Sequence, residues 1–309
     1  MDKIKTIAVV GPTASGKTSL GVELAKHFGG EVVSADSMQI YKYMDIATAK
    51  PTVAEMQGIP HHMMDFLLPT EPYSVAKYKE DAMKCIEDIA SRGKIPVIVG
   101  GTGLYVDTLL YNTEFFDIKI DEKLRKSLYE KCEKLGCDKM WEELKEIDPV
   151  SAESIHKNNR KKIIRALEVY YQTGKTISQQ TKLSRLSGEV LDYKIIGLSA
   201  RNRDVLYDRI NRRVDIMLKD GLLEEAKDFF EKYNTATAAQ AIGYKELLPF
   251  FESRLSLEEC AENLKMQTRR YAKRQLTWFR RNENINWLYI DDYKDGELIE
   301  KAVEIIEEG

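Results

Sequence analysis

The sequence has few of the residues that support a disulfide framework, a fibrous structure or a membrane span. Only 4 of its 309 residues are cysteine, and 8 are proline. Cys85, Cys132, Cys137 and Cys260 form no Cys-x2-Cys pair, which argues against a zinc site and favours reduced thiols. No apolar run approaches the ~18 residues that a membrane span needs, and the first residues lack a signal-peptide pattern. We therefore expect a cytoplasmic protein with no membrane partner.

The remaining composition is that of a globular chain with one or two domains. Hydrophobic residues make up 43% of the sequence, which is too much for a disordered chain. The 47 lysines and arginines nearly balance the 50 aspartates and glutamates, and the net charge is −3. Because this sum neither favours nor excludes a nucleic-acid partner, the distribution of charge along the chain is more informative.

Short apolar runs alternate with amphipathic stretches along much of the chain. The run 4–10 is rich in β-branched residues and predicts a strand, whereas the apolar residues of 73–92 recur at helical spacing. Strands that alternate with helices form a parallel sheet with crossover helices. Further strands are predicted at 31–36, 95–101, 194–200 and 285–290.

The first strand is followed by GPTASGKT, residues 11–18, which fits the spacing G-x4-G-K-[ST] between a strand and a helix. Gly11 and Gly16 allow the backbone N–H groups of the loop to converge on one anion, and the following helix adds its positive end. Lys17 supplies a cation for the terminal phosphate, and the Thr18 hydroxyl can bind Mg²⁺. The loop therefore predicts binding of a di- or triphosphate.

Between residues 113 and 190 the strand pattern disappears, and helical stretches follow one another. This change indicates a helical insertion between strands of the sheet. We predict an α/β fold, a P-loop NTPase-like parallel sheet flanked by helices, with an inserted all-helical domain. The catalytic core would comprise residues 1–112 and 191–309, with its C-terminal helices, and the insertion residues 113–190.

Two polar positions follow predicted strands at the edge where ligands bind in such sheets. Asp36 ends the strand 31–36, and it can serve as a general base, assist Mg²⁺ or cap a turn. The strand 95–101 is followed by Thr102 in a glycine-rich turn, without the aspartate that assists Mg²⁺ in nucleotide hydrolases. Thr102 can donate a hydrogen bond to a substrate, or the turn is a simple connection between strand and helix.

Basic residues are concentrated in two segments, 157–165 and 265–281. Clustered lysine and arginine side chains fit binding to a phosphate backbone, and Tyr271, Trp278 and Phe279 can stack on unpaired bases. The alternative is a solvated helix face with core aromatics. One arginine of the RINRR segment, residues 209–213, can complete a diphosphate clamp.

Two functions are compatible with these residues alone. The loop and the fold favour an ATP-dependent small-molecule kinase with Asp36 as base, but this hypothesis leaves the basic segments without a role. An RNA-binding NTPase is a second hypothesis, although the missing strand-end aspartate argues against hydrolysis.

The following motifs occur along the chain in this order: GPTASGKT, SADSMQIYKYMDIATAKPT, PHHMMD, GGTGLY, RALEVYYQTGKT, RINRRVDIML, AIGYKE and RRYAKRQLTWFR. Their order resembles that of the tRNA dimethylallyltransferases, also called tRNA isopentenyltransferases, over nearly the whole chain. This resemblance implies transfer of the five-carbon prenyl group from dimethylallyl diphosphate to N6 of the adenosine 3′ of the anticodon (position 37), with release of diphosphate. It also implies Mg²⁺ and the anticodon stem-loop of tRNA as partners, and we expect a monomer.

The family pattern also implies roles for individual residues. Asp36 corresponds to the general base, Lys17 and Arg213 to the groups that hold the leaving diphosphate, and Thr18 to the Mg²⁺ ligand, with Thr102 as a further catalytic position. The segment around 161–165, which reads KKIIR here, departs from the basic-apolar pattern that the family often shows.

Two sets of binding residues follow from the same resemblance. The diphosphate site comprises Gly11, Pro12, Thr13, Ala14, Ser15, Gly16, Lys17 and Thr18. The tRNA site comprises Asp36, Ser37, Met38, Gln39, Thr102, Arg125, Lys161, Lys162, Ile163, Ile164, Arg165, Gln240, Ala241, Ile242, Gly243, Tyr244 and Lys245.

Overall fold

The computed structural model of the chain describes residues 3–113, 121–184, 188–233, 238–294 and 296–308. The chain divides into two compact units, one formed by Met1–Leu110 with Val190–Gly309 and the other by Tyr111–Glu189. Across the described residues, no helix combines the length and the apolar character that crossing a membrane requires.

An open sheet of six parallel strands forms the centre of the first unit, in the order β3-β2-β4-β1-β5-β6. The predicted parallel α/β architecture is therefore confirmed. Only β3 was not predicted, because two residues are too few to show a strand pattern. The strands are β1 (Ile4–Val10), β2 (Glu31–Ser34), β3 (His61–His62), β4 (Pro96–Gly100), β5 (Leu191–Ser199) and β6 (Ile285–Tyr289).

Helices cover both faces of this sheet. Successive residues of a strand point to opposite faces, so β1 packs Ile7 and Val9 on one face and Ala8 and Val10 on the other. The first face is covered by α1 (Lys17–His27) and α14 (Glu297–Glu307), and the second by α3 (Val75–Ser91) and α4 (Gly103–Leu110). The two cores therefore hold the sheet between two layers of helices.

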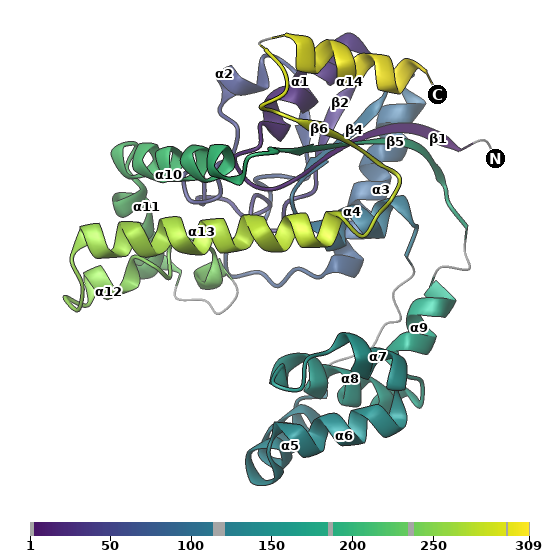
Figure 1. The fold of residues 1–309 in the computed structure, drawn as a ribbon, viewed down its shortest axis with the longest axis vertical. Helices are drawn as coiled ribbons and strands as arrows, with labels where there is room; N and C mark the ends of the chain where they lie inside the picture. The colour runs from purple at the N-terminus through teal and green to yellow at the C-terminus, as the bar shows by residue number, and fades with distance from the viewer. Residues whose placement is uncertain (1–2, 114–120, 185–187, 234–237, 295, 309) are drawn as a thin grey trace. The chain divides into compact units, whose positions relative to one another are not determined.

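A further apolar core in the same unit forms beyond the carboxyl edge of the sheet, around Tyr41, Met44 and Tyr244. It joins the loop after β2 to a group of C-terminal helices, of which α10 and α13 run side by side (Figure 1). The C-terminal elements are α10 (Arg203–Lys219), α11 (Leu222–Lys232), the 3₁₀ turn η1 (Ala238–Gln240), α12 (Leu248–Phe251) and α13 (Leu257–Phe279). The short helix α2 (Val53–Met56) lies in the connection between β2 and β3.

The described part of the second unit is helical. Its core contains Leu128, Met140, Leu144, Ile163 and Leu167, which come from three of its helices. The helices are α5 (Glu122–Leu135), α6 (Cys137–Ile147), α7 (Pro149–Ser154), α8 (Arg160–Thr173) and α9 (Ile177–Ser184).

Candidate active site

A cavity of about 360 Å³ lies at the carboxyl edge of the sheet in the first unit. The phosphate loop and the ends of β2 and β4 form one side of it, and α10, α13 and the segment after η1 form the other. Both apolar and charged side chains line the cavity, so it suits a ligand that has a charged and an apolar part. The charged lining residues are Lys17, Asp36, Arg213, Lys245 and Arg274.

The phosphate loop has the backbone conformation that an anion site requires. Gly16 has φ 92° and precedes α1 without any side-chain cap, so that the first N–H groups of the helix are not used by a capping side chain. Gly11 has φ 143°, and a Cβ there would lie 2.3 Å from the carbonyl oxygen of Leu198. Glycine is therefore required at position 11 for close packing of the loop against β5.

Two buried cations meet at this end of the cavity. Lys17 Nζ donates to the Pro12 carbonyl oxygen at 2.6 Å. Burial and the nearby Arg213 lower the pKa of Lys17 to about 7, against the opposing effect of Asp36. Burial likewise lowers the pKa of Arg213. Because an anion bound between them would offset this penalty, the pair is suited to hold a diphosphate.

Asp36 lies in the same cavity, directly after β2. Its Oδ1 accepts hydrogen bonds from the Met38 N–H at 2.9 Å and the Gln39 N–H at 3.4 Å. Among the described residues none donates to Oδ2. The capping role and the role as a base are therefore compatible, since one oxygen fixes the turn and the other can accept a proton.

Thr102 holds the segment that carries Asp36 but does not itself line the cavity. Its Oγ1 accepts a hydrogen bond from the Ser37 N–H at 3.0 Å, and its backbone N–H donates to the Ala35 carbonyl at 3.1 Å. The structure thus gives Thr102 a positioning role, and its direct contact with a substrate stays a prediction.

Gln275 on α13 is a site residue that the sequence analysis missed. Its side chain is buried, accepts a hydrogen bond from the Thr13 N–H at 2.9 Å and donates to the Gly101 carbonyl at 3.0 Å. It therefore joins the phosphate loop to the turn after β4. No local pattern marks Gln275 in the sequence, because both partners are far away along the chain.

Glu225 on α11 was also missed, and it supports the opposite wall. Its carboxylate accepts hydrogen bonds from the backbone N–H groups of Asp45, Ile46 and Ala47 at 2.7–2.9 Å, and from the Tyr244 hydroxyl at 2.9 Å. Residues 47–49 line the cavity. The clamp thus fixes their position relative to the segment that follows η1.

The predicted tRNA residues of the first unit divide between cavity and core. The side chain of Tyr244 is fully buried, so it supports the wall instead of facing a ligand. The side chain of Gln240 lies outside the described part of the structure. The residues that line the cavity are Asp36, Ser37, Met38, Gln39, Ala241, Ile242, Gly243 and Lys245.

In the second unit, Arg125 and Arg165 are engaged with a buried carboxylate. Arg125 Nε and Arg165 Nη1 lie 2.9 and 2.8 Å from oxygens of Glu168, whose side chain is 1% exposed. Ile163 and Ile164 belong to the core of the unit, so their side chains are not available to tRNA, contrary to the prediction. Only Lys161 and Lys162 of this segment are exposed without a partner among the described residues.

The aromatic and basic side chains of α13 divide between the core, ion pairs and the cavity. Phe279 is 2% exposed in the sheet core, and Trp278 Nε1 donates to Asp107 Oδ2 at 2.8 Å. Lys265 is paired with Asp215 at 2.8 Å. Tyr271 does line the cavity, and burial raises its pKa.

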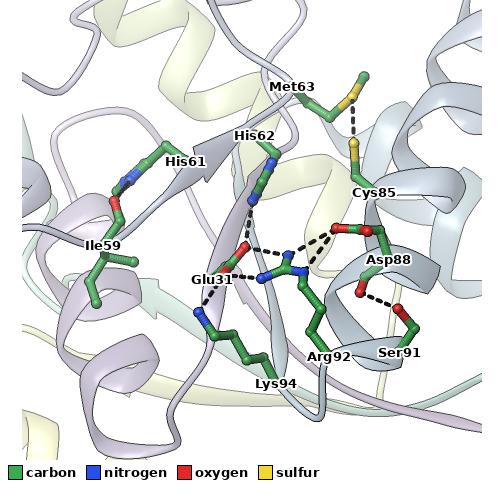
Figure 2. Close-up of polar contacts among 10 residues, drawn as sticks. All are labelled: Glu31, Ile59, His61, His62, Met63, Cys85, Asp88, Ser91, Arg92 and Lys94. Carbon is green, nitrogen blue, oxygen red and sulfur yellow. Dashed lines mark hydrogen bonds and ion pairs between the residues drawn. The ribbon is translucent and has the colours of Figure 1, made fainter.

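A second cluster of buried charge lies on β2, around Glu31 (Figure 2). Its side chain is 3% exposed and contacts three cationic or basic groups: Arg92 Nη2 at 2.8 Å, Lys94 Nζ at 2.6 Å and His62 Nε2 at 2.7 Å. Hydrogen bonding, above all from Arg92, holds the pKa of Glu31 well below its usual range. None of these four side chains lines the 360 Å³ cavity. Their contacts instead join β2, β3 and the connection between α3 and β4.

Comparison with known sequences points to one family. The family model described as IPP transferase matches residues 39–282, and the one described as isopentenyl transferase matches residues 4–66. A tRNA dimethylallyltransferase of Caldanaerobacter subterraneus subsp. tengcongensis is 49% identical over 305 residues, which cover 97% of this chain and 96% of the relative.

Solved structures give the same result. A full-length tRNA isopentenylpyrophosphate transferase from Bacillus halodurans is 42% identical, with a TM-score of 0.74 over 99% of this chain and 98% of that one. A eukaryotic dimethylallyltransferase described as acting on tRNA is 34% identical, with a TM-score of 0.82 over 97% of this chain and 78% of that one. The matches therefore extend over both units and the cavity.

Proposed function

The chain belongs to the tRNA dimethylallyltransferase family, and from this premise we propose that it transfers a dimethylallyl group from dimethylallyl diphosphate to N6 of the adenosine 3′ of the anticodon (position 37) in tRNA. The observation that carries this proposal is the convergence of Lys17, Arg213 and Asp36 on one cavity. The two cations suit a diphosphate, and a carboxylate in the same cavity suits the deprotonation of an acceptor amine.

The charged end of the cavity stabilises the diphosphate leaving group. As the allylic C–O bond breaks, the electron pair goes to diphosphate, whose negative charge increases. Lys17, Arg213 and the N–H groups at the start of α1 lie at one end of the cavity, where they can stabilise this charge as it develops. The apolar part of the cavity accepts the prenyl chain.

Asp36 serves the acceptor. The exocyclic amine attacks the first carbon of the prenyl chain, a C–N bond forms, and the amine proton passes to the carboxylate. A stacked base cannot reach the cavity, so the adenine has to leave the stack. Met38, Gln39 and Ile242 offer the wall against which it can lie.

The residues present fit a Mg²⁺ ion that depends on the substrate for most of its ligands. Thr18 lines the cavity, and no described residue is hydrogen-bonded to its hydroxyl. Among the described residues no group of three or more His, Cys, Asp or Glu side chains can hold a metal. A site with one hydroxyl, phosphate oxygens and water is typical of Mg²⁺. When bound, the ion neutralises charge on the diphosphate.

Diphosphate release from dimethylallyl diphosphate tests the reaction directly. We expect release only with an unmodified anticodon stem-loop that has adenosine 3′ of the anticodon, and none when guanosine replaces it. ATP is the parallel substrate, because phosphate transfer from ATP without prenyl transfer would make the protein a kinase.

Asp36→Asn tests the general base. Asparagine keeps the oxygen that accepts from Met38 and Gln39, so the turn should persist while the base is lost. We expect turnover to fall by about 10²-fold or more, with RNA and dimethylallyl diphosphate affinities nearly unchanged. Wild-type single-turnover rates would remove Asp36 from this role.

A further inference from the structure

The two histidines of β3 point to opposite faces of the sheet, as neighbours in a strand do. His62 is in register with Val33 and contacts Glu31 on the α3 face (Figure 2). His61 is in register with Val32, whose side chain belongs to the core on the α1 face. The reaction proposed above uses neither histidine.

Hydrogen bonding fixes the proton of His61. Its Nδ1 lies 2.9 Å from the Ile59 carbonyl oxygen, which can only accept, so Nδ1 is the donor. Burial lowers the pKa of His61, with a smaller contribution from His62, and this favours the neutral ring. Nε2 is therefore an acceptor, yet it is buried and has no hydrogen-bond partner among the described residues. Such an atom calls for a donor.

The unpartnered nitrogen belongs to a residue that lines a small cavity shared with the phosphate loop. The cavity has a volume of about 20 Å³, and its polar lining residues are Thr18, Ser34, Gln39 and His61. This volume is enough for one water molecule.

The polar hydrogens of two of these side chains are already engaged in other hydrogen bonds. Ser34 Oγ donates to Gln39 Oε1 at 3.1 Å, and Gln39 Nε2 donates to the carbonyls of Thr48 and Ala49. The Thr18 hydroxyl is therefore the donor that remains in this cavity.

We propose that His61 is a positioning residue for the phosphate site, acting on Thr18 through one bound water. The Thr18 hydroxyl donates to the water, and the water donates to His61 Nε2. This arrangement turns the lone pairs of the Thr18 oxygen away from the water and toward a cation. It would supply, with a neutral acceptor, the support for Mg²⁺ that a strand-end aspartate gives in nucleotide hydrolases.

This inference rests on the Mg²⁺ site of the proposed function, so the experiment measures metal dependence without turnover. Binding of inorganic diphosphate to the full chain is followed by calorimetry over a series of Mg²⁺ concentrations. The variants are His61→Leu, which removes the acceptor, and His61→Gln, which keeps an acceptor on a side chain of similar reach. His62→Gln is the matched control from the same strand.

We expect His61→Leu to raise the Mg²⁺ concentration for half-maximal binding by about tenfold, as loss of an outer-shell partner does. His61→Gln should stay within about threefold of wild type, and His62→Gln should not change the value. Equal values for His61→Leu and wild type would overturn the proposal, and so would equal losses in all three variants. A crystal structure with no water against Nε2 would overturn it independently, even if His61→Leu failed to fold.

The Thr18→Ala variant separates this failure from failure of the metal site. Mg²⁺-independent binding of diphosphate by wild type and Thr18→Ala alike would contradict the proposed Mg²⁺ site itself. Mg²⁺ dependence that is lost in Thr18→Ala but normal in His61→Leu would contradict only the role of His61.

Discussion

Buried charge is arranged in opposite ways in the cavity and around Glu31. Four cationic side chains and one carboxylate line the cavity, and Lys17 donates there to the Pro12 carbonyl oxygen. Around Glu31, one buried carboxylate holds Arg92, Lys94 and His62. The lowered pKa of Lys17 favours its neutral form, whereas the lowered pKa of Glu31 favours its charged form.

This difference separates a binding site from a structural cluster. The excess positive charge of the cavity is not balanced until an anion binds, whereas the charge of Glu31 is already balanced by protein groups. The second unit follows the same rule, because Glu168 engages Arg125 and Arg165 and leaves Lys161 and Lys162 exposed. A basic residue is therefore stronger evidence for ligand binding when its side chain forms no ion pair with a carboxylate of the protein.

The largest effect is expected from Lys17→Met. Removing the cation should lower kcat/KM for dimethylallyl diphosphate by about 10²–10³-fold, because a fixed charge on the leaving group is lost. Steady-state kinetics measure this. Lys26→Met, on the exposed face of the same helix, is the control and should leave kcat/KM unchanged. Comparable losses in both variants would mean that α1, and not the charge, is responsible.

The pH dependence of stability gives a second test of the same residue. Lys17 has a pKa of about 7 in the folded chain against 10.5 as its ordinary value, so the folded state binds fewer protons between these pH values. The free energy of unfolding should therefore rise with pH from about 7 upward, relative to Lys17→Met. Denaturant titrations of both proteins at neutral and alkaline pH show whether this difference exists.

Glu31→Gln should act on stability and not on chemistry. We expect the free energy of unfolding to fall by about 2–4 kcal/mol, since three partners lose the carboxylate but can still reach solvent. Turnover well below the melting temperature should not change. Glu87→Gln on the exposed face of α3 should stay within about 0.5 kcal/mol of wild type. A loss of turnover in folded Glu31→Gln would contradict the separation drawn above.

Acid should weaken the Glu31 cluster in a defined direction. The pKa of Glu31 is depressed in the folded chain, so its contribution is present above its ordinary pKa of 4.5 and is lost progressively as the pH falls below that value. Acid unfolding of wild type and Glu31→Gln should therefore converge at low pH, and parallel curves would contradict this account.

The smallest effect is expected from the exposed lysines of the second unit. Lys161→Ala and Lys162→Ala should each weaken tRNA binding by about two- to fivefold and reduce its salt dependence by about one phosphate contact. Affinity for dimethylallyl diphosphate should not change. Arg165→Ala should instead lower stability, because it leaves part of the Glu168 pair unsatisfied. Binding titrations at two salt concentrations distinguish the two classes.

Local patterns were enough to predict most of the sheet. Residues 7–10 and 95–101 are apolar throughout, as strands buried on both faces are, and they lie in or next to β1 and β4. β5 begins at Leu191, before the predicted 194, because residues 191–193 form no continuous apolar run and join the strand by pairing with β1. β3 exists only because it pairs with β2, so its two histidines show no strand pattern of their own.

The candidate site was predictable where a motif is continuous in sequence. The phosphate loop and Asp36 follow strands and could be placed at the sheet edge from the sequence. Gln275 and Glu225 act on backbone atoms that lie 262 and about 180 residues away, and no local pattern encodes such contacts. The ion pair of Arg125 with Glu168 also joins residues that are distant in the sequence. A basic residue that stabilises the fold therefore cannot be distinguished in the sequence from one that binds tRNA.

The hydrogen bond from Thr13 to Gln275 also has a consequence for synthesis of the protein. A ribosome adds about 5–20 residues per second, so roughly 13–50 s separate translation of the loop from translation of its partner. During that interval the nascent chain has its phosphate-binding motif but lacks α13, which forms part of the cavity wall. A chain whose translation stops early would therefore keep the motif and lack the pocket, so substrate would be bound only by nearly finished molecules.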